Sequence, residues 1–261
     1  MLVLLLHSLR SRSRSALTFL LRKKARSPPS LASLVQSSMC FDLTSSFIAW
    51  GLANSASWFL FQRNRGYDRW NASFITCFST IQILEAGLWA DAPPSSRFNN
   101  PPLSRANAPP SSRSKPAGKA FTNEFLTKLI ILGLTAQPAI QTIAGYKYTH
   151  QPILWYMSWV FVGFFIYTLM RTLRAKPGEY HSTLGEKGHW IWSPGLAPGF
   201  GVLYLIGLFF PLLFMKDGKG LSLLLVGMGT AAYSLFAAGK GEFGSLWCFT
   251  AVLYSFAAIL V

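Results

Sequence analysis

The chain has 261 residues, of which 51% are hydrophobic and only 13% are charged, and its mean hydropathy is +0.33. This composition excludes an ordinary soluble domain, which needs a charged and solvated surface. The net charge of +15 would favour a nucleic-acid partner in a soluble protein, but here the basic residues lie in the N-terminal stretch and the loops. We therefore expect them to orient helices against anionic lipid, and we expect no nucleic-acid partner.

Residues 1–38 differ in composition from the rest of the chain. They contain seven basic residues, many serines and no acid. A segment that is rich in arginine and serine and free of acids is typical of an organelle transit peptide, which would place the protein in a mitochondrial or plastid membrane. The alternative is an extension of the gene model that has no role. Under either interpretation, residues 1–38 do not belong to the fold.

Seven hydrophobic segments follow, at about 41–61, 73–91, 124–146, 152–171, 197–215, 220–239 and 243–261. A helix that crosses a bilayer needs roughly 20 mostly apolar residues. The connections between the segments are too short to build a sizeable soluble core. The sequence therefore predicts an all-α fold for residues 39–261, an integral membrane bundle of seven transmembrane helices surrounded by the lipid bilayer.

The connection between the second and third segments, residues 92–119, is unusual. It repeats Pro-Pro and Ser-Ser steps, contains the near-repeat PPSSR at 93–97 and 109–113, and shows no apolar period. This composition predicts a disordered loop. We assign it no function.

The distribution of basic residues predicts an orientation. If the N-terminus defines side A, that side carries 17 basic residues and the opposite side B carries 6. The positive-inside rule then places side A in the cytosol or matrix. The excess lies entirely in residues 1–38 and the Pro/Ser-rich loop, because without them the counts become 5 and 6.

Glu85 is an acid at membrane depth, within the second hydrophobic segment. Such a group normally faces the interior of a helix bundle and indicates a functional site. Gln82 and Trp89 share its helix face. Gln137 and Gln141 are one turn apart on the third segment and flank Pro138, which removes a backbone donor. The sequence therefore predicts a polar intramembrane site from Glu85, Gln82, Trp89, Gln137 and Gln141.

A second candidate group lies toward side A. Cys40, Glu85, His189 and Cys248 are all predicted near that side, and thiolate, imidazole and carboxylate are common ligands of transition metals. No Cys-x-x-Cys or His-x-x-x-His spacing supports a metal site. A disulfide between Cys40 and Cys248 and a pair of inert thiols are the alternatives, and no cofactor is assigned.

Several of these residues carry a resemblance to a known family. Met39-Cys40-Phe41 with Ser45-Ser46-Phe47, Gln82-x-x-Glu85-x-x-x-Trp89, His189, and Ser245-Leu246-Trp247-Cys248-Phe249 with Ala251 resemble a family of small seven-helix membrane proteins that begin Met-Cys-Phe-Ser. The resemblance covers residues 39–261 except the Pro/Ser-rich loop. Asp42 replaces the usual serine, and the 92–119 insertion is foreign to the pattern. The resemblance implies the fold and marks these positions, but it implies no activity.

Three functions fit the sequence. The favoured one is a transporter, channel or small-molecule sensor whose polar site around Glu85 binds a small solute or ion, which makes an enzyme the less favoured class. The second is a membrane-embedded metal or thiol enzyme that uses Cys40, Glu85, His189 and Cys248. The third is a structural or assembly protein in which Glu85 is a polar staple between helices.

Overall fold

The structure is a computed structural model that describes residues 42–92, 120–185, 188–194, 200–239 and 241–261. All of these belong to one compact unit, Phe41–Val261. The N-terminal extension, Cys40 and nearly all of the Pro/Ser-rich loop lie outside the described residues. The predictions made for them therefore remain predictions.

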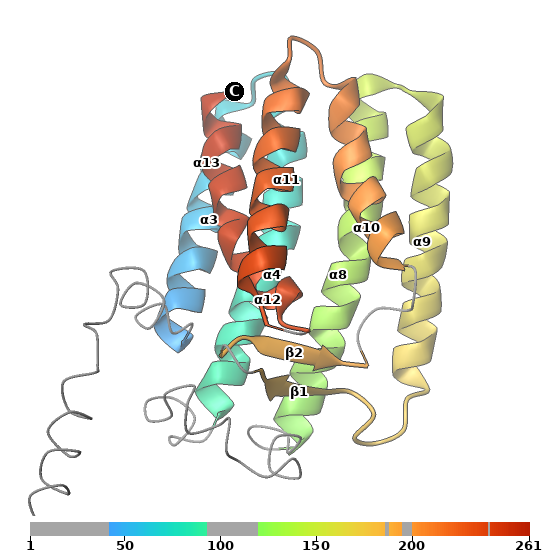
Figure 1. The fold of residues 1–261 in the computed structure, drawn as a ribbon. Coiled ribbons are helices and arrows are strands. Elements are labelled where there is room, and N and C mark those ends of the chain that lie inside the picture. Colours follow the sequence, from blue (N-terminus) through green and yellow to red (C-terminus); the bar gives the residue numbers. More distant parts are fainter. Residues whose placement is uncertain (1–41, 93–119, 186–187, 195–199, 240) are drawn as a thin grey trace, which may run out of the picture. The chain divides into compact units, whose positions relative to one another are not determined.

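Each of the seven hydrophobic segments is helical in its described part, which confirms the all-α fold (Figure 1). The helices are α3 (Leu43–Arg63), α4 (Asp68–Asp91), α8 (Ala120–Thr149), α9 (Pro152–Leu173), α10 (Phe200–Phe209) with the 3-10 turn η1 (Phe210–Phe214), α11 (Lys219–Ala237), α12 (Phe243–Thr250) and α13 (Val252–Leu260).

Four helical stretches of the described chain are long and apolar enough to cross a membrane. They are Phe121–Thr149, Pro152–Leu173, Lys219–Ala237 and Phe243–Leu260. The α10–η1 stretch is apolar but shorter. Helices α3 and α4 are long, but serine, asparagine, glutamine and acidic residues dilute their apolar character.

Local sequence explains where several elements begin and break. At the start of α3, the Ser45 amide donates to Asp42 Oδ1 and the Asp42 amide donates to Ser45 Oγ, both at 2.8 Å. Asp42 thus acts as an N-cap, a role in which aspartate and serine are similarly effective. The segment predicted as one helix at 243–261 is broken at Ala251, which separates α12 from α13.

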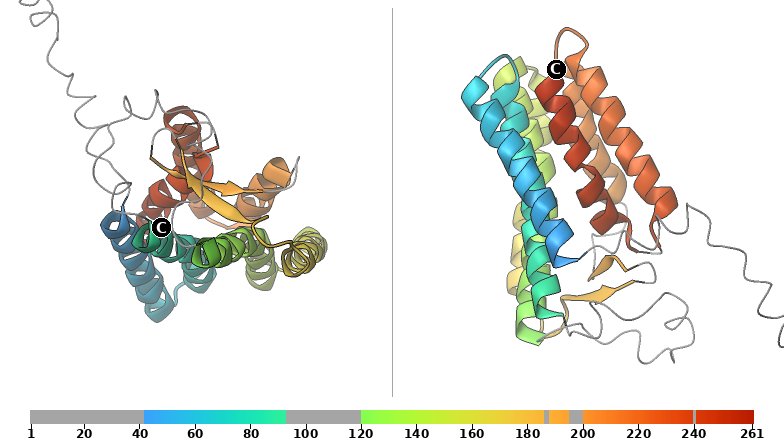
Figure 2. Two further views of the ribbon diagram at one scale, coloured as in Figure 1. Left: turned by 90° about the horizontal axis from the view of Figure 1, so that it is seen from below. Right: turned by 90° about the vertical axis from the view of Figure 1, so that its left-hand side faces the viewer.

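The helices of this unit form two layers (Figure 2). Helices α3, α4, α8 and α9 lie in a row in which sequence neighbours pack together, and α10, α11 and α12–α13 form the second layer. Between the layers, α10 packs on α8, α12 packs on α4, and α13 packs on both α3 and α4. Helix α4 is therefore central, with most of its length covered.

A β-hairpin that the sequence did not predict lies at one end of the bundle (Figure 1). Strand β1 (His181–Leu184) pairs antiparallel with β2 (Trp190–Ser193). Asn123 at the start of α8 holds β1, because its Nδ2 donates to the Ser182 carbonyl at 3.1 Å and its Oδ1 accepts from the Ser182 amide at 2.7 Å. We call this end, which also contains the start of α12, end A; it corresponds to side A.

The opposite end, end B, contains the turn between α3 and α4. Arg63 donates from Nε and Nη2 to the two carboxylate oxygens of Asp68 at 2.8 and 2.7 Å. Its Nη1 also donates to the Ile259 carbonyl of α13 at 2.6 Å. One guanidinium therefore joins α3, α4 and the last helix.

The unit has an apolar exterior, and its largely apolar interior also contains many polar side chains. Large exposed apolar side chains occur on α3, α9, α10, α11 and α13, among them Phe47, Trp58, Trp159, Val202, Leu225, Phe236 and Leu260. Buried polar side chains include Asn71, Gln82, Glu85, Asn123, Gln137 and Gln141. This distribution is the reverse of a soluble domain and suits a protein solvated by lipid.

Candidate functional site

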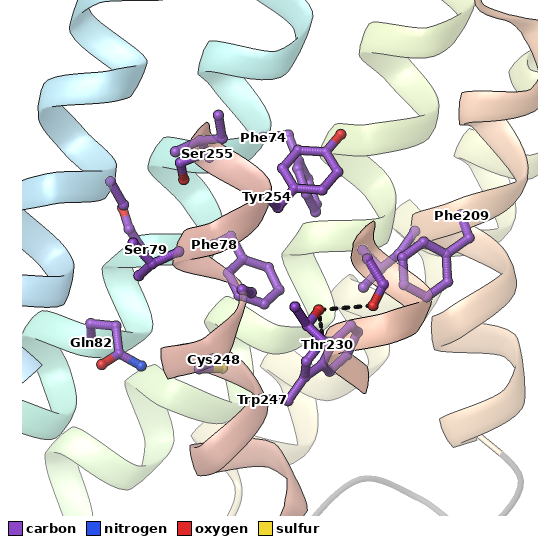
Figure 3. Close-up of a pocket in the computed structure, with 16 residues that line it drawn as sticks. Phe74, Phe78, Ser79, Gln82, Phe209, Thr230, Trp247, Cys248, Tyr254 and Ser255 are labelled. Atoms are coloured by element: carbon purple, nitrogen blue, oxygen red, sulfur yellow. Dashed lines mark hydrogen bonds between the residues drawn. The ribbon is translucent and has the colours of Figure 1, made fainter. Parts of the chain in front are cut away.

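A cavity lies between the two layers, next to the central helix α4 (Figure 3). Its empty space, including the part open to the outside, is about 460 Å³. Its lining residues come from α3, α4, α10, α11, α12 and α13, and among them are Phe74, Phe78, Gln82, Phe209, Trp247, Cys248 and Tyr254. Because this figure includes open space, it is an upper limit on the room that the cavity offers to a bound molecule.

Gln82 and Glu85 form the polar end of this cavity. Their exposed fractions are 1% and 2%. Gln82 lines the cavity, and its Nε2 donates to Glu85 Oε2 at 3.3 Å. The other oxygen of each side chain, Gln82 Oε1 and Glu85 Oε1, has no hydrogen-bond partner among the described residues. A buried acceptor without a partner is costly, so these two atoms favour a bound molecule that donates a hydrogen bond to them.

Helix α12 completes the polar end from the second layer. The Cys248 thiol lines the cavity and lies within electrostatic reach of the Glu85 carboxyl. The Ser245 hydroxyl, one turn earlier on the same helix, also lies near that carboxyl. Glu85 of α4 and Cys248 of α12 therefore lie near each other where these two helices pack.

The remaining walls are largely aromatic. The Trp247 ring lies edge-on to Phe78 with 5.8 Å between centroids, and 6.0 Å from Phe209. Phe74 and Tyr254 meet edge to face at 5.4 Å. Gly227 allows Phe209 to approach α11, because a Cβ there would lie 2.4 Å from Phe209 Cε1. Face and edge contacts of this kind hold aromatic rings in defined orientations.

Trp89 lies on the predicted face of α4 but outside the cavity lining. Its ring packs against Trp190 of strand β2, with 5.0 Å between centroids. Trp89 therefore fixes the hairpin on α4 at end A.

Gln137 belongs to a separate polar pair. The Tyr204 hydroxyl of α10 donates to Gln137 Oε1, and both side chains are buried. Gln137 Nε2 has no hydrogen-bond partner within the described part of the chain. Gln137 does not line the cavity, although Tyr204 packs against Trp247, which does.

Gln141 is structural, although the sequence placed it in the polar site. Its Oε1 accepts from Trp70 Nε1 at 2.9 Å, and its Nε2 donates to the Leu208 carbonyl at 3.1 Å. These bonds join α8 to α4 and α10. Because both its amide atoms are engaged, Gln141 has little capacity left for a ligand.

The predicted metal cluster does not form from the residues that the structure describes. No three His, Cys, Asp or Glu side chains among them gather closely enough to hold a metal ion, so Glu85, His189 and Cys248 do not form such a group. His189 lies at the tip of the hairpin, where its backbone amide donates to Glu242 Oε2 at 3.0 Å. Cys40 lies outside the described residues, so its proposed ligation or disulfide remains untested.

No protein-family model, curated protein or solved structure matches this chain. The resemblance to the Met-Cys-Phe-Ser family therefore remains a prediction. The chemistry of the cavity carries the functional conclusion.

Two buried polar groups were not found from the sequence. Glu242 is fully buried between α11 and α12, where Gly185 of the hairpin turn leaves no room for a Cβ, which would lie 2.2 Å from Glu242 Cδ. Tyr204 lies in an apolar segment as the partner of Gln137. The single acid in the short 240–242 connection was the only available signal for Glu242. For Tyr204 the signal was one hydroxyl in an otherwise apolar helix.

Proposed function

We propose that this chain is a seven-pass integral membrane protein that binds a small solute in the cavity between its layers, as a transporter or sensor. Gln82 and Glu85 form the polar contact, and the aromatic walls hold the apolar part of the solute. The observation that carries the proposal is the pair of buried acceptor oxygens at the end of the cavity, for which the described residues supply no hydrogen-bond partner.

Seven passes are supported by the outward faces of helices that fall short of the other four, α3 in mean hydropathy and α10 in length. Mean hydropathy counts inward-facing side chains such as Ser46 and Ser57, which are buried on α3. The lipid would contact Phe47, Ile48 and Trp58 of the same helix, which are exposed. Helix α10 likewise exposes Val202, Leu203 and Ile206. An apolar outward face is what a lipid-facing helix requires.

A polar staple is supported less well than a binding site. Polar staples in membranes form hydrogen bonds between helices. The Gln82–Glu85 bond lies within α4, whereas Gln141 joins three helices. The two interhelical hydrogen bonds of Gln141 thus make it the stronger staple, whereas Glu85, among the described residues, hydrogen-bonds to another helix only through the Ser245 hydroxyl of α12.

The test is whether a solute protects Cys248 from a thiol reagent. One variant keeps Cys248 and carries Cys40→Ser and Cys77→Ala; the control keeps Cys77, which is half-buried on α4 and outside the cavity lining. Both are reconstituted in lipid nanodiscs and treated with methyl methanethiosulfonate in the presence of six-carbon solutes. We expect at least one solute to slow modification of Cys248 and not of Cys77. Equal effects on both thiols with every solute would contradict the proposal.

A further inference from the structure

The charged groups around the cavity are acidic and not basic among the described residues. One carboxyl, Glu85, lies directly behind its polar end. No lysine or arginine is among the described residues that line it. A solute with a negatively charged head would therefore meet an acid and no compensating base, and burying such a pair in a low dielectric is unfavourable.

The polar end also offers acceptors in place of donors. The Nε2 group of Gln82 is used by Glu85, and what remains open is the oxygen of the amide and one oxygen of the carboxyl. These atoms need a hydrogen-bond donor. A hydroxyl brings one donor, whereas an ammonium brings three and a positive charge.

The aromatic walls also favour a positively charged head group. Phe74, Phe78, Phe209, Trp247 and Tyr254 all line the cavity (Figure 3). The faces of aromatic rings attract cations, most strongly when the cation is desolvated, and acidic groups beside such rings are a recurring way to hold an ammonium. The same rings also accommodate an apolar chain.

We infer that the solute is a compact apolar amine, bound as its ammonium ion. The inference rests on the proposed function and names the class of ligand for that site. The ammonium donates to Gln82 Oε1 and is attracted by the Glu85 carboxylate, while the hydrocarbon part lies against Phe78, Phe209 and Trp247. A cavity of about 460 Å³ limits the apolar part to a short chain or a single ring system.

The experiment uses matched probes on the Cys248 and Cys77 proteins described above. Hexylamine, hexyltrimethylammonium, hexanol and hexanoate have the same chain and differ in the head. We expect hexylamine to protect Cys248 at the lowest concentration. Hexyltrimethylammonium should protect more weakly, because it has no N–H to donate, and hexanoate should not protect. Because all four probes enter lipid to some extent, a slowing seen equally at Cys77 is counted as a bilayer effect.

Two substitutions test the residues. Glu85→Gln keeps the shape and removes the charge, and Gln82→Leu removes the open acceptor. Each is expected to raise the hexylamine concentration needed for half protection by about tenfold or more, which corresponds to about 1.4 kcal/mol. Thr80→Ala, on the exposed face of the same helix, is the matched control and should leave that concentration unchanged.

A second measurement covers the case in which Cys248 reacts too slowly. A ligand that binds the folded state raises the midpoint of thermal unfolding. Hexylamine should therefore raise the midpoint of the wild-type protein and of Thr80→Ala, but not of Glu85→Gln. Protection or stabilisation by hexanol or hexanoate above hexylamine would overturn the amine and leave the binding cavity in place. No effect of any probe in either measurement would overturn both proposals.

Discussion

Three buried glutamines illustrate how differently one residue type is used in this bundle. Gln141 has both amide atoms bonded across helices, Gln137 pairs through its oxygen with Tyr204, and Gln82 bonds only to Glu85. Among the three, Gln82 is the one whose described hydrogen bond stays within its own helix, as the proposed binding role requires.

This contrast predicts opposite effects of the same substitution. Gln141→Leu removes two interhelical hydrogen bonds and leaves the buried Trp70 Nε1 without its acceptor, so we expect it to lower the free energy of unfolding by about 2–4 kcal/mol. Gln82→Leu removes one weak bond and one unpartnered oxygen, so its effect should be below about 1 kcal/mol. Unfolding in mixed detergent micelles measures both. A larger loss for Gln82→Leu would mean that Gln82 is structural.

Among single residues, the sequence predicted those that interrupt an apolar segment with a polar side chain. Glu85 and Gln82 were found because polar side chains stand out in an apolar segment. Gln141 stands out equally, but its role depends on its bonds to Trp70 and Leu208. Both residues are distant in sequence, and neither residue type indicates that its partner is a glutamine. Glu242 was missed because an acid in a loop is ordinarily solvated, and only the hairpin that folds over it makes it buried.

The elements of the second layer approach one another through glycines of α11. At Gly220 a Cβ would lie 1.7 Å from the Leu212 carbonyl oxygen, a backbone atom that cannot rotate away. At Gly229, on the same helix, nothing lies within 4 Å. Small residues therefore serve different purposes at the two positions, and their spacing alone does not separate them.

Alanine at these two positions should have effects of opposite sign. Gly220→Ala must push η1 away from α11 and is expected to cost about 1–3 kcal/mol of unfolding free energy. Gly229→Ala should be neutral or stabilising by up to about 1 kcal/mol, because alanine restricts the unfolded chain more than glycine. Thermal unfolding of the two variants compares them directly. Equal losses at both positions would show that η1 does not pack on α11 as described.

The sequence predicted helices well and their interruptions poorly. Apolar runs mark the seven helical segments, but the break at Ala251 occurs in a uniformly apolar stretch. The hairpin was missed because its strands have only four residues each, too few for an alternating pattern to be recognised. The hairpin depends on tertiary contacts, such as those of Asn123 with Ser182.

The ion pair at end B predicts a pH dependence of stability. Burial of Asp68 acts to raise its pKa, but hydrogen bonds from the Arg63 side chain and the Arg65 amide, with the Arg63 charge, outweigh burial and hold the pKa below its ordinary value. A carboxyl with a lowered pKa in the folded state stabilises the protein above its unfolded pKa of about 3.9. This contribution is lost as the pH falls through the folded value.

Asp68→Asn should therefore lower stability by about 2 kcal/mol at neutral pH. The difference from wild type should begin to shrink once the pH falls below about 4, where the Asp68 carboxyl of the unfolded chain takes up its proton, and it should disappear as the pH falls through the lower pKa of the folded state. Denaturation measured between pH 7 and pH 3 tests this, with Asp217→Asn in an exposed turn as the control. A difference that persisted unchanged at pH 3 would show that the charge of Asp68 is not what stabilises this end.

At the scale of the whole molecule, the proposed seven passes would place the two ends on opposite faces of the membrane. Lys176 lies exposed in the connection between α9 and the hairpin at end A, and Lys216 lies exposed in the turn before α11 at end B. In a cysteine-free background, Lys176→Cys and Lys216→Cys should react with a membrane-impermeant maleimide from opposite faces of sealed vesicles. Labelling of both from the same face would contradict seven passes.

The helices also differ in length, and this difference acts on the lipid. At 1.5 Å per residue the 30 residues of α8 extend about 45 Å, whereas the 19 residues of α11 extend about 28 Å. The hydrocarbon core of a typical bilayer is about 30 Å thick. Helix α11 therefore nearly matches the hydrocarbon core, whereas about 15 Å of α8 must extend beyond it or be accommodated by tilt. Lipids with longer acyl chains should therefore strain the bilayer at α11 before they do so at α8.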